Sequence, residues 1–266
     1  MRRRLDLLFG TALCAFAVTL VTCGGGNQTP STGQTQNVAP ASSGAAAPVS
    51  PVDAATAATV TGKVTFAGTP PAVQPVKLSS DPYCEKANPG LTTETAVVGR
   101  DGSLGNVFVY VKDGLGNRTF PTPSEPVVLD QKGCHYTPHV MGIQIGQPLQ
   151  IINSDDTLHN IHGLAKSNRE FNQGQPIQGM KMTHTFSTKE VMIPFKCDVH
   201  GWMNAWIGVL DHPYYSVTST DGTFSLKGLP PGSYTIEAWH ERLGTQTQTI
   251  TVGEKETKNV SFTFKA

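Results

Sequence analysis

The chain is dominated by short segments in which apolar and polar residues alternate, separated by clusters of Gly, Pro, Asn and Asp. This alternation recurs from Thr59 onward, and no uninterrupted stretch of about twelve residues has helical periodicity. The turn dipeptides Asp101-Gly102 and Asp221-Gly222 lie between strand-like runs. Many short strands joined by such turns are typical of sandwiches and barrels, so we predict an all-β fold. The predicted strands are Val60–Phe66, Asn106–Val111, Gly142–Ile145, Pro148–Asn153, His184–Phe186, Val191–Cys197, Ala205–Leu210, Thr223–Leu226, Ser233–His240, Gln246–Val252 and Asn259–Phe264.

Composition excludes several other classes of protein. The 266 residues include 27 glycines and 19 prolines, and only 15% are charged, which argues against coiled coils and helical bundles. The 20 basic residues are balanced by 20 acidic ones, so no overall field attracts the chain to nucleic acid. We therefore do not expect a nucleic-acid-binding protein.

The N-terminus has the features of an export signal. Three arginines at positions 2–4 precede an apolar run over 7–21, which is too short to span a bilayer of about 30 Å comfortably. The pattern predicts a signal peptide over residues 1–22. The run ends in Leu20-Val21-Thr22-Cys23, which resembles the lipobox of bacterial lipoproteins. This resemblance implies that Cys23 is acylated; a plain secretory signal with an accidental cysteine is the alternative.

Residues 23–58 form a low-complexity stretch of small and polar residues with a single charge. Such a stretch cannot bury enough apolar area to offset its chain entropy, so we expect a disordered tether. Together with the export signal, it predicts a domain that is lipid-anchored in the bacterial cell envelope, in the periplasm or at the outer membrane.

The five cysteines have different expected roles. Cys14 lies within the signal peptide and Cys23 would carry lipid. In an oxidising compartment Cys84 and Cys134 are a plausible disulfide, which leaves Cys197 unpaired. Metal ligation explains a lone thiol in an exported protein. Two alternatives stay open: a buried Cys197 with no ligand, or a bond between Cys84 and Cys197.

The segment Phe195–Met203 contains the pattern Cys-x2-His-x2-Met at the end of a predicted strand. Alternation puts Val191, Ile193, Phe195 and Cys197 on one face. The next strand begins near Ala205, so a tight loop can direct three side chains to one point.

Thiolate, imidazole and thioether donors together favour copper. One cysteine, two histidines and a weak axial methionine define a blue-copper electron-transfer site. A structural zinc site would more usually contain two to four cysteines in paired spacing. The second histidine is expected from a distant strand, and Pro148–Asn153 leads into His159-Asn160-Ile161-His162.

These segments resemble the cupredoxins, and most closely the amicyanin group, over about residues 106–210. The shared features are Cys-x2-His-x2-Met, the His-Asn-x-His segment and the Met-rich stretch 179–182. The resemblance implies that His159, Cys197 and His200 bind copper equatorially and that Met203 is axial. It also implies that Asn160 hydrogen-bonds between the two ligand segments, and that His200 lies near the loop surface where electrons enter and leave. His162 is the alternative upstream ligand.

The C-terminal segment has the turns of a second family. Asp221-Gly222-x-Phe224 and Pro230-Pro231-Gly232-x-Tyr234 resemble the carboxypeptidase regulatory-like (transthyretin-like) sandwich module. Val60–Phe66 looks like that family's first strand, although it lies far upstream. The resemblance implies that the copper domain is inserted within, or packed against, a split sandwich.

The sequence therefore predicts a cupredoxin-like Greek-key β-sandwich, a second smaller β-sandwich and a disordered N-terminal tether. The expected parts are a signal peptide, a linker, an N-terminal β segment, a copper domain and a regulatory-like segment, at 1–22, 23–58, 59–94, 95–212 and 213–266. We expect a non-enzymatic electron-transfer protein with one type 1 copper per chain. Its expected partners are envelope redox proteins such as a c-type cytochrome or a dehydrogenase. The alternatives are a metal-free adhesion or carbohydrate-binding sandwich and a copper carrier.

Overall fold

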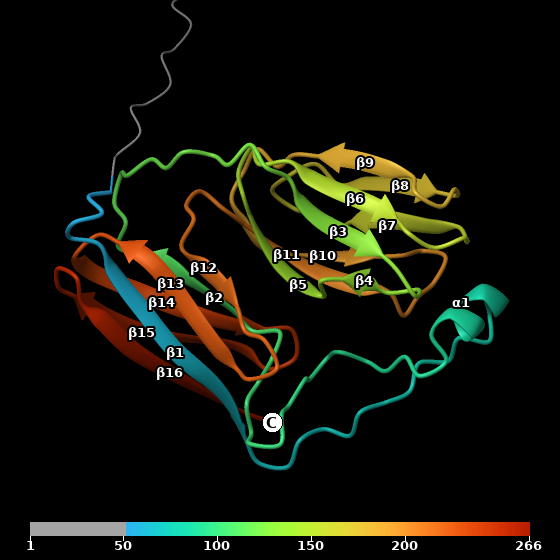
Figure 1. The fold of residues 1–266 in the computed structure, drawn as a ribbon, viewed down its shortest axis with the longest axis horizontal. Helices are drawn as coiled ribbons and strands as arrows, with labels where there is room; N and C mark the ends of the chain where they lie inside the picture. Colours follow the sequence, from blue (N-terminus) through green and yellow to red (C-terminus); the bar gives the residue numbers. More distant parts are fainter. Residues whose placement is uncertain (1–51) are drawn as a thin grey trace, which may run out of the picture. The chain divides into compact units, whose positions relative to one another are not determined.

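A computed structural model describes residues 52–266 (Figure 1). The predicted signal peptide, Cys23 and most of the predicted tether lie outside these residues. The described chain contains sixteen strands and one short helix, so the prediction of an all-β fold is confirmed. Across residues 52–266, no helix has the length and apolar character needed to cross a membrane.

The first sandwich is built from both ends of the described chain, which Figure 1 shows as blue β1 beside red β16. Its core contains the inward-facing residues of two sheets, among them Val64, Phe262 and Ile236. One sheet has the order β13-β1-β16 and the other β12-β2-β14-β15. The bounds are β1 Ala58–Ala67, β2 Phe108–Asp113, β12 Tyr215–Val217, β13 Thr223–Leu229, β14 Gly232–His240, β15 Gly244–Val252 and β16 Thr257–Lys265.

The second sandwich is formed by the chain between β2 and β12 and carries the candidate ligands. Its sheets have the orders β5-β11-β10-β7-β8 and β4-β3-β6-β9, and a separate apolar core lies among them. The bounds are β3 Val127–Gln131, β4 Tyr136–Thr137, β5 Val140–Gln144, β6 Leu149–Asn153, β7 His159–Gly163, β8 Phe171–Gln175, β9 Lys181–His184, β10 Glu190–Lys196 and β11 Asn204–Leu210.

The two sandwiches share a third apolar cluster. It joins Phe108 and Tyr110 of β2 with Val140, Met192 and Leu210 of the second sandwich. Strand β2 lies within the range 95–212 predicted for the copper domain, but it pairs with β12 and β14 of the first sandwich.

The connection from β1 to β2 contains the helix α1, Pro82–Ala87. Asp81 is its N-cap and accepts hydrogen bonds from the backbone N–H groups of Tyr83 and Cys84. Proline at the first helical position is favourable because its missing N–H needs no partner there. With only six residues, α1 is too short to produce a periodic signal in the sequence.

Several strands differ from their predicted form. β7 has three consecutive buried residues, His159, Asn160 and Ile161, so it lacks the alternation that identifies a strand. The expectation that Val191 shares a face with Cys197 is wrong. The pairing register of β10 shifts between Glu190 and Ile193, and Met192 there has a φ of 61°, so alternation holds only from Ile193 onward.

Candidate metal centre

Neighbouring strands bring the two candidate ligand segments together. β10 pairs with β7 so that Lys196 lies opposite His162 and Phe195 opposite Gly163. Cys197 directly follows β10 and continues this antiparallel alignment. Its Sγ accepts a hydrogen bond from the backbone N–H of Asn160, and the N–S distance is 3.5 Å. The loop then closes through two backbone hydrogen bonds, Met203 N–H to His200 O at 2.9 Å and Cys197 N–H to Met203 O at 3.1 Å.

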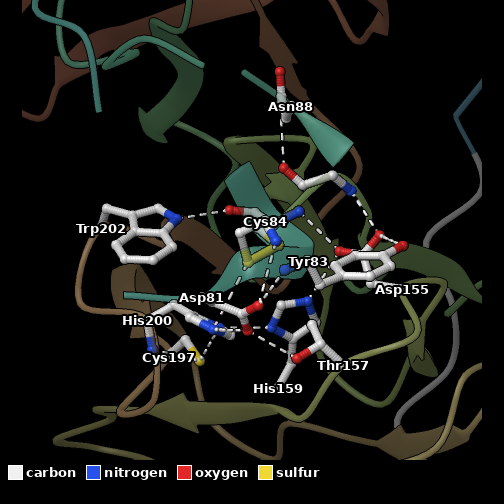
Figure 2. The surroundings of a disulfide bond; sticks show 12 residues. Asp81, Tyr83, Cys84, Asn88, Asp155, Thr157, His159, Cys197, His200 and Trp202 are labelled. Atoms are coloured by element: carbon white, nitrogen blue, oxygen red, sulfur yellow. Dashed lines mark hydrogen bonds and ion pairs between the residues drawn. A yellow bond between two sulfur atoms is a disulfide. The ribbon is translucent and has the colours of Figure 1, made fainter. Parts of the chain in front are cut away.

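The structure brings His159, Cys197 and His200 into one cluster, with their donor atoms within 4.8 Å of one another. Nδ1 of His159 lies 3.0 Å from Nδ1 of His200, which lies 3.9 Å from Sγ of Cys197. The three residues are 0%, 1% and 2% exposed in the order His159, Cys197, His200. Figure 2 shows the two imidazole rings close together beside the cysteine sulfur, and their planes are inclined at 71°.

Met203 and Asn160 belong to the two segments that carry these donors. Met203 is buried in the same apolar cluster as Cys197. The side-chain oxygen of Asn160 accepts a hydrogen bond from the backbone N–H of Asp198 at 2.6 Å. Its amide nitrogen donates to the side chains of Asn172 and Asp198. Asn160 therefore links β7 to the Cys197 loop.

The surroundings of Cys197 favour its thiolate. Burial raises the pKa of the thiol, but hydrogen bonds from His159 and from the N–H groups of Asn160 and His200 outweigh burial and lower it. The N–H of His200 lies 3.3 Å from Sγ. A thiolate is the form of cysteine that binds metals.

The two histidines differ in their affinity for protons. Burial opposes protonation of both rings. Hydrogen bonds and charge from Asp155 and Cys197 outweigh burial and raise the pKa of His159. Burial and the neighbouring His159 keep the pKa of His200 below its ordinary value, despite Asp81. His159 is therefore the more basic of the two rings.

The expectation that His200 lies near the surface is wrong. A segment of the β1–β2 connection covers it: Asp81 Oδ2 lies 2.9 Å from Nε2 of His200. The disulfide between Cys84 and Cys134 is present, and Sγ of Cys84 lies 3.8 Å from the same nitrogen (Figure 2). Trp202 donates its indole N–H to the backbone oxygen of Cys134, which ties the ligand loop to the disulfide.

His162 does not join the cluster. Its ring points to the other face of β7, where Nδ1 lies 2.9 Å from Asp198 and Nε2 lies 2.8 Å from Glu170. Two further groups of potential ligands, one with Cys84 and one with Cys134, contain disulfide sulfurs and therefore offer no thiolate.

The sequence interpretation missed Asp81 and Asp155. Asp155 Oδ2 lies 2.9 Å from Nε2 of His159. In the sequence, the clue to this contact is that Asp155 stands four residues before His159. The sequence around Asp81 indicates only a helix cap, through the pair Asp81-Pro82. Its contact with His200 joins residues 119 positions apart, so no local pattern reveals it.

Comparisons with known proteins give a family for one part of the chain. A match to the carboxypeptidase regulatory-like domain family covers residues 204–265, which confirms that predicted resemblance. The match includes β11, a strand of the second sandwich. A search of curated proteins found no match.

Several solved copper proteins are similar in structure. A Cu-containing nitrite reductase from Thermus scotoductus SA-01 is 19% identical with a TM-score of 0.32, over 37% of this chain and 25% of that chain. An amicyanin mutant in the Cu(I) form is 17% identical with a TM-score of 0.29, over 38% of this chain and 97% of that chain. A purple cupredoxin from Nitrosopumilus maritimus is 23% identical with a TM-score of 0.25, over 28% and 81%. The chain thus spans about a quarter of the nitrite reductase, and the case for a metal rests on its own residues.

Proposed function

We propose that this chain is a type 1 copper protein that transfers single electrons. The observation that carries the proposal is the convergence of two Nδ1 atoms and one thiol in a buried position, each on a residue of the second sandwich. Each Nε2 already faces a carboxylate, so both Nδ1 lone pairs face the same point when the rings are neutral. A cation held there by His159 and His200 would offset the repulsion between these lone pairs.

The donor set fits copper better than the other common metals. A single thiolate with two imidazoles selects a soft, nitrogen-preferring ion, and buried Met203 is the candidate for a weak axial thioether. Structural zinc sites usually have four strong protein ligands, and among residues 52–266 three strong donors form this cluster. His159, Cys197 and His200 would hold the ion, with Met203 beside them.

When bound, copper supplies a reversible one-electron couple. The protein's contribution is to hold the ligands in one arrangement for both oxidation states, so that little reorganisation accompanies transfer. Asn160 fixes the spacing of the two ligand segments, and two backbone N–H groups donate to the thiolate. The buried ligands exclude water, and we propose no bond-making reaction.

The proposed partners are redox proteins of the cell envelope, with the chain anchored through Cys23. Two exposed apolar side chains, Leu158 and Val199, directly precede His159 and His200 in sequence. They suit a partner that docks briefly against apolar surface near the ligands.

Visible spectroscopy with copper quantification tests the proposal. The protein loaded with Cu(II) should bind about one copper and absorb strongly at about 600 nm, as thiolate-bound blue copper does. Cys197→Ser should abolish the band, and His159→Gln should abolish or strongly weaken it. His162→Gln is the matched control, because this histidine lies on the same strand with its ring directed away from the cluster.

Unchanged colour and copper content in Cys197→Ser would contradict the ligand assignment. A wild-type chain that takes up no copper would instead indicate a metal-free sandwich. Reversible one-electron voltammetry is expected. Rapid loss of copper to a chelator without such a wave would indicate a carrier.

A further inference from the structure

Both candidate histidine ligands have a carboxylate on the nitrogen that faces away from the metal position. Asp155 Oδ2 is 2.9 Å from Nε2 of His159, and Asp81 Oδ2 is 2.9 Å from Nε2 of His200. Asp155 is buried and Asp81 is largely buried. A carboxylate only accepts hydrogen bonds, so each of these Nε2 atoms carries the proton.

Asp155 is fixed in place by further donors. Its carboxylate accepts the backbone N–H groups of Gly133 and Cys134, both at 2.8 Å, and the hydroxyl of Tyr83 at 3.2 Å. It therefore has donors on both oxygens and cannot turn away from His159 without leaving buried N–H groups unpaired.

Asp81, the partner of His200, is held in a similar way. It caps α1 through the N–H groups of Tyr83 and Cys84, and it accepts the hydroxyl of Thr157 at 2.8 Å. The disulfide holds Cys84 to Cys134, whose N–H binds Asp155. The two aspartates thus belong to one connected network, visible in Figure 2 around the two imidazole rings.

We propose that Asp81 and Asp155 are positioning residues that fix both imidazoles in the Nε2–H tautomer and direct both Nδ1 atoms to a single copper ion. This inference rests on the proposed function. Neither aspartate touches the metal position; each acts through its histidine. Carboxylate partners also make imidazole a more basic ligand, which favours Cu(II) over Cu(I) and lowers the reduction potential.

The test uses Asp81→Asn and Asp155→Asn in the full protein. The NH2 group of the introduced asparagine can only donate, and the groups around each aspartate are themselves donors. The amide therefore cannot reproduce the hydrogen bonds of the carboxylate. Each variant should bind Cu(II) about 10- to 100-fold more weakly than wild type and should have a higher midpoint potential. The matched controls are Glu85→Gln, on the exposed face of α1, and Asp156→Asn, the exposed neighbour of Asp155. Both controls should behave as wild type.

A readout without copper keeps the inference testable if a variant fails to fold. In the metal-free wild-type protein, imidazole ¹⁵N NMR should show a proton on Nε2 of both His159 and His200. An Nε2 without a proton on either ring would overturn the proposal. The proposal would also be overturned if the aspartate variants matched the controls in copper affinity and reduction potential. The proposed function would stand in that case. A wild-type chain without copper overturns the proposed function and this inference together.

Discussion

At Gly142 of β5, a Cβ would lie 2.3 Å from two ring carbons of Tyr215 and 2.9 Å from Phe108. These rings belong to the cluster shared by the two sandwiches, so they have little room to move. We expect Gly142→Ala to lower the free energy of unfolding by about 1–3 kcal/mol. Gly174→Ala in β8, where nothing lies within 4 Å, is the control and should have little effect. Urea denaturation measures both, and equal stability of the two variants would contradict this account.

Individual residues of the candidate ligand cluster were more predictable than their protein partners. Cys197, His200 and Met203 were proposed as ligands from the spacing of one short loop, and His159 from its place after a strand and from the resemblance to cupredoxins. Asp81 was not identified, since its role depends on a contact across 119 residues. The burial of His200 was missed for the same reason: the segment that covers it comes from before β2.

Among the elements, the segment with α1 depends most on a covalent link. The disulfide joins Cys84 of α1 to Cys134 just before β4, a sequence separation of 50. Closing a loop of this length in the unfolded chain is worth about 4 kcal/mol in the chain-entropy model. We expect Cys84→Ala/Cys134→Ala to lose about that stability, measured by denaturation without reductant. In excess dithiothreitol, the unfolding free energy of wild type should fall toward that of the variant. Equal stability of oxidised and reduced wild type would contradict this account.

Most long strands were predictable, and short or irregular elements were not. β15 and β16 alternate along most of their nine residues, and β14 departs from alternation only where Glu237 is buried between Ile236 and Ala238, so the predicted cores of all three coincide with the structure. β12 has only three residues, and β7 is buried on both faces near the ligands. In those places the tertiary environment, and not the local pattern, decides the conformation.

For the whole molecule, a buried ion pair links the two sandwiches. Nε2 of His139, before β5, lies 2.7 Å from Glu241, which follows β14 and also accepts the indole N–H of Trp206. Burial lowers the pKa of His139, but Glu241 and, more weakly, Glu94 outweigh burial and raise it. Burial likewise raises the pKa of Glu241. The hydrogen bond and charge of His139 outweigh burial and lower this pKa, with a smaller contribution from His240.

The pair should make stability depend on pH. Because the folded pKa of His139 is raised, its contribution is complete below about pH 6.5 and is lost as pH rises through the folded value. We expect Glu241→Gln to cost about 3 kcal/mol near pH 6 and clearly less near pH 9. Unfolding free energies at the two pH values measure this difference. Glu254→Gln, at an exposed position, is the control, and an equal cost of Glu241→Gln at both pH values would contradict the assignment.

The pairing of β1 with β16 has a mechanical consequence. The two strands are parallel, and their register runs from Thr59 opposite Thr257 to Ala67 opposite Lys265. The start of β1 and the end of β16 therefore lie at opposite ends of the pair. A pull between these two points slides one strand along the other and loads all the bridging hydrogen bonds at once, instead of unzipping them singly. A domain tethered through the residues before β1 would thus resist a pull whose opposing force acts at the end of β16.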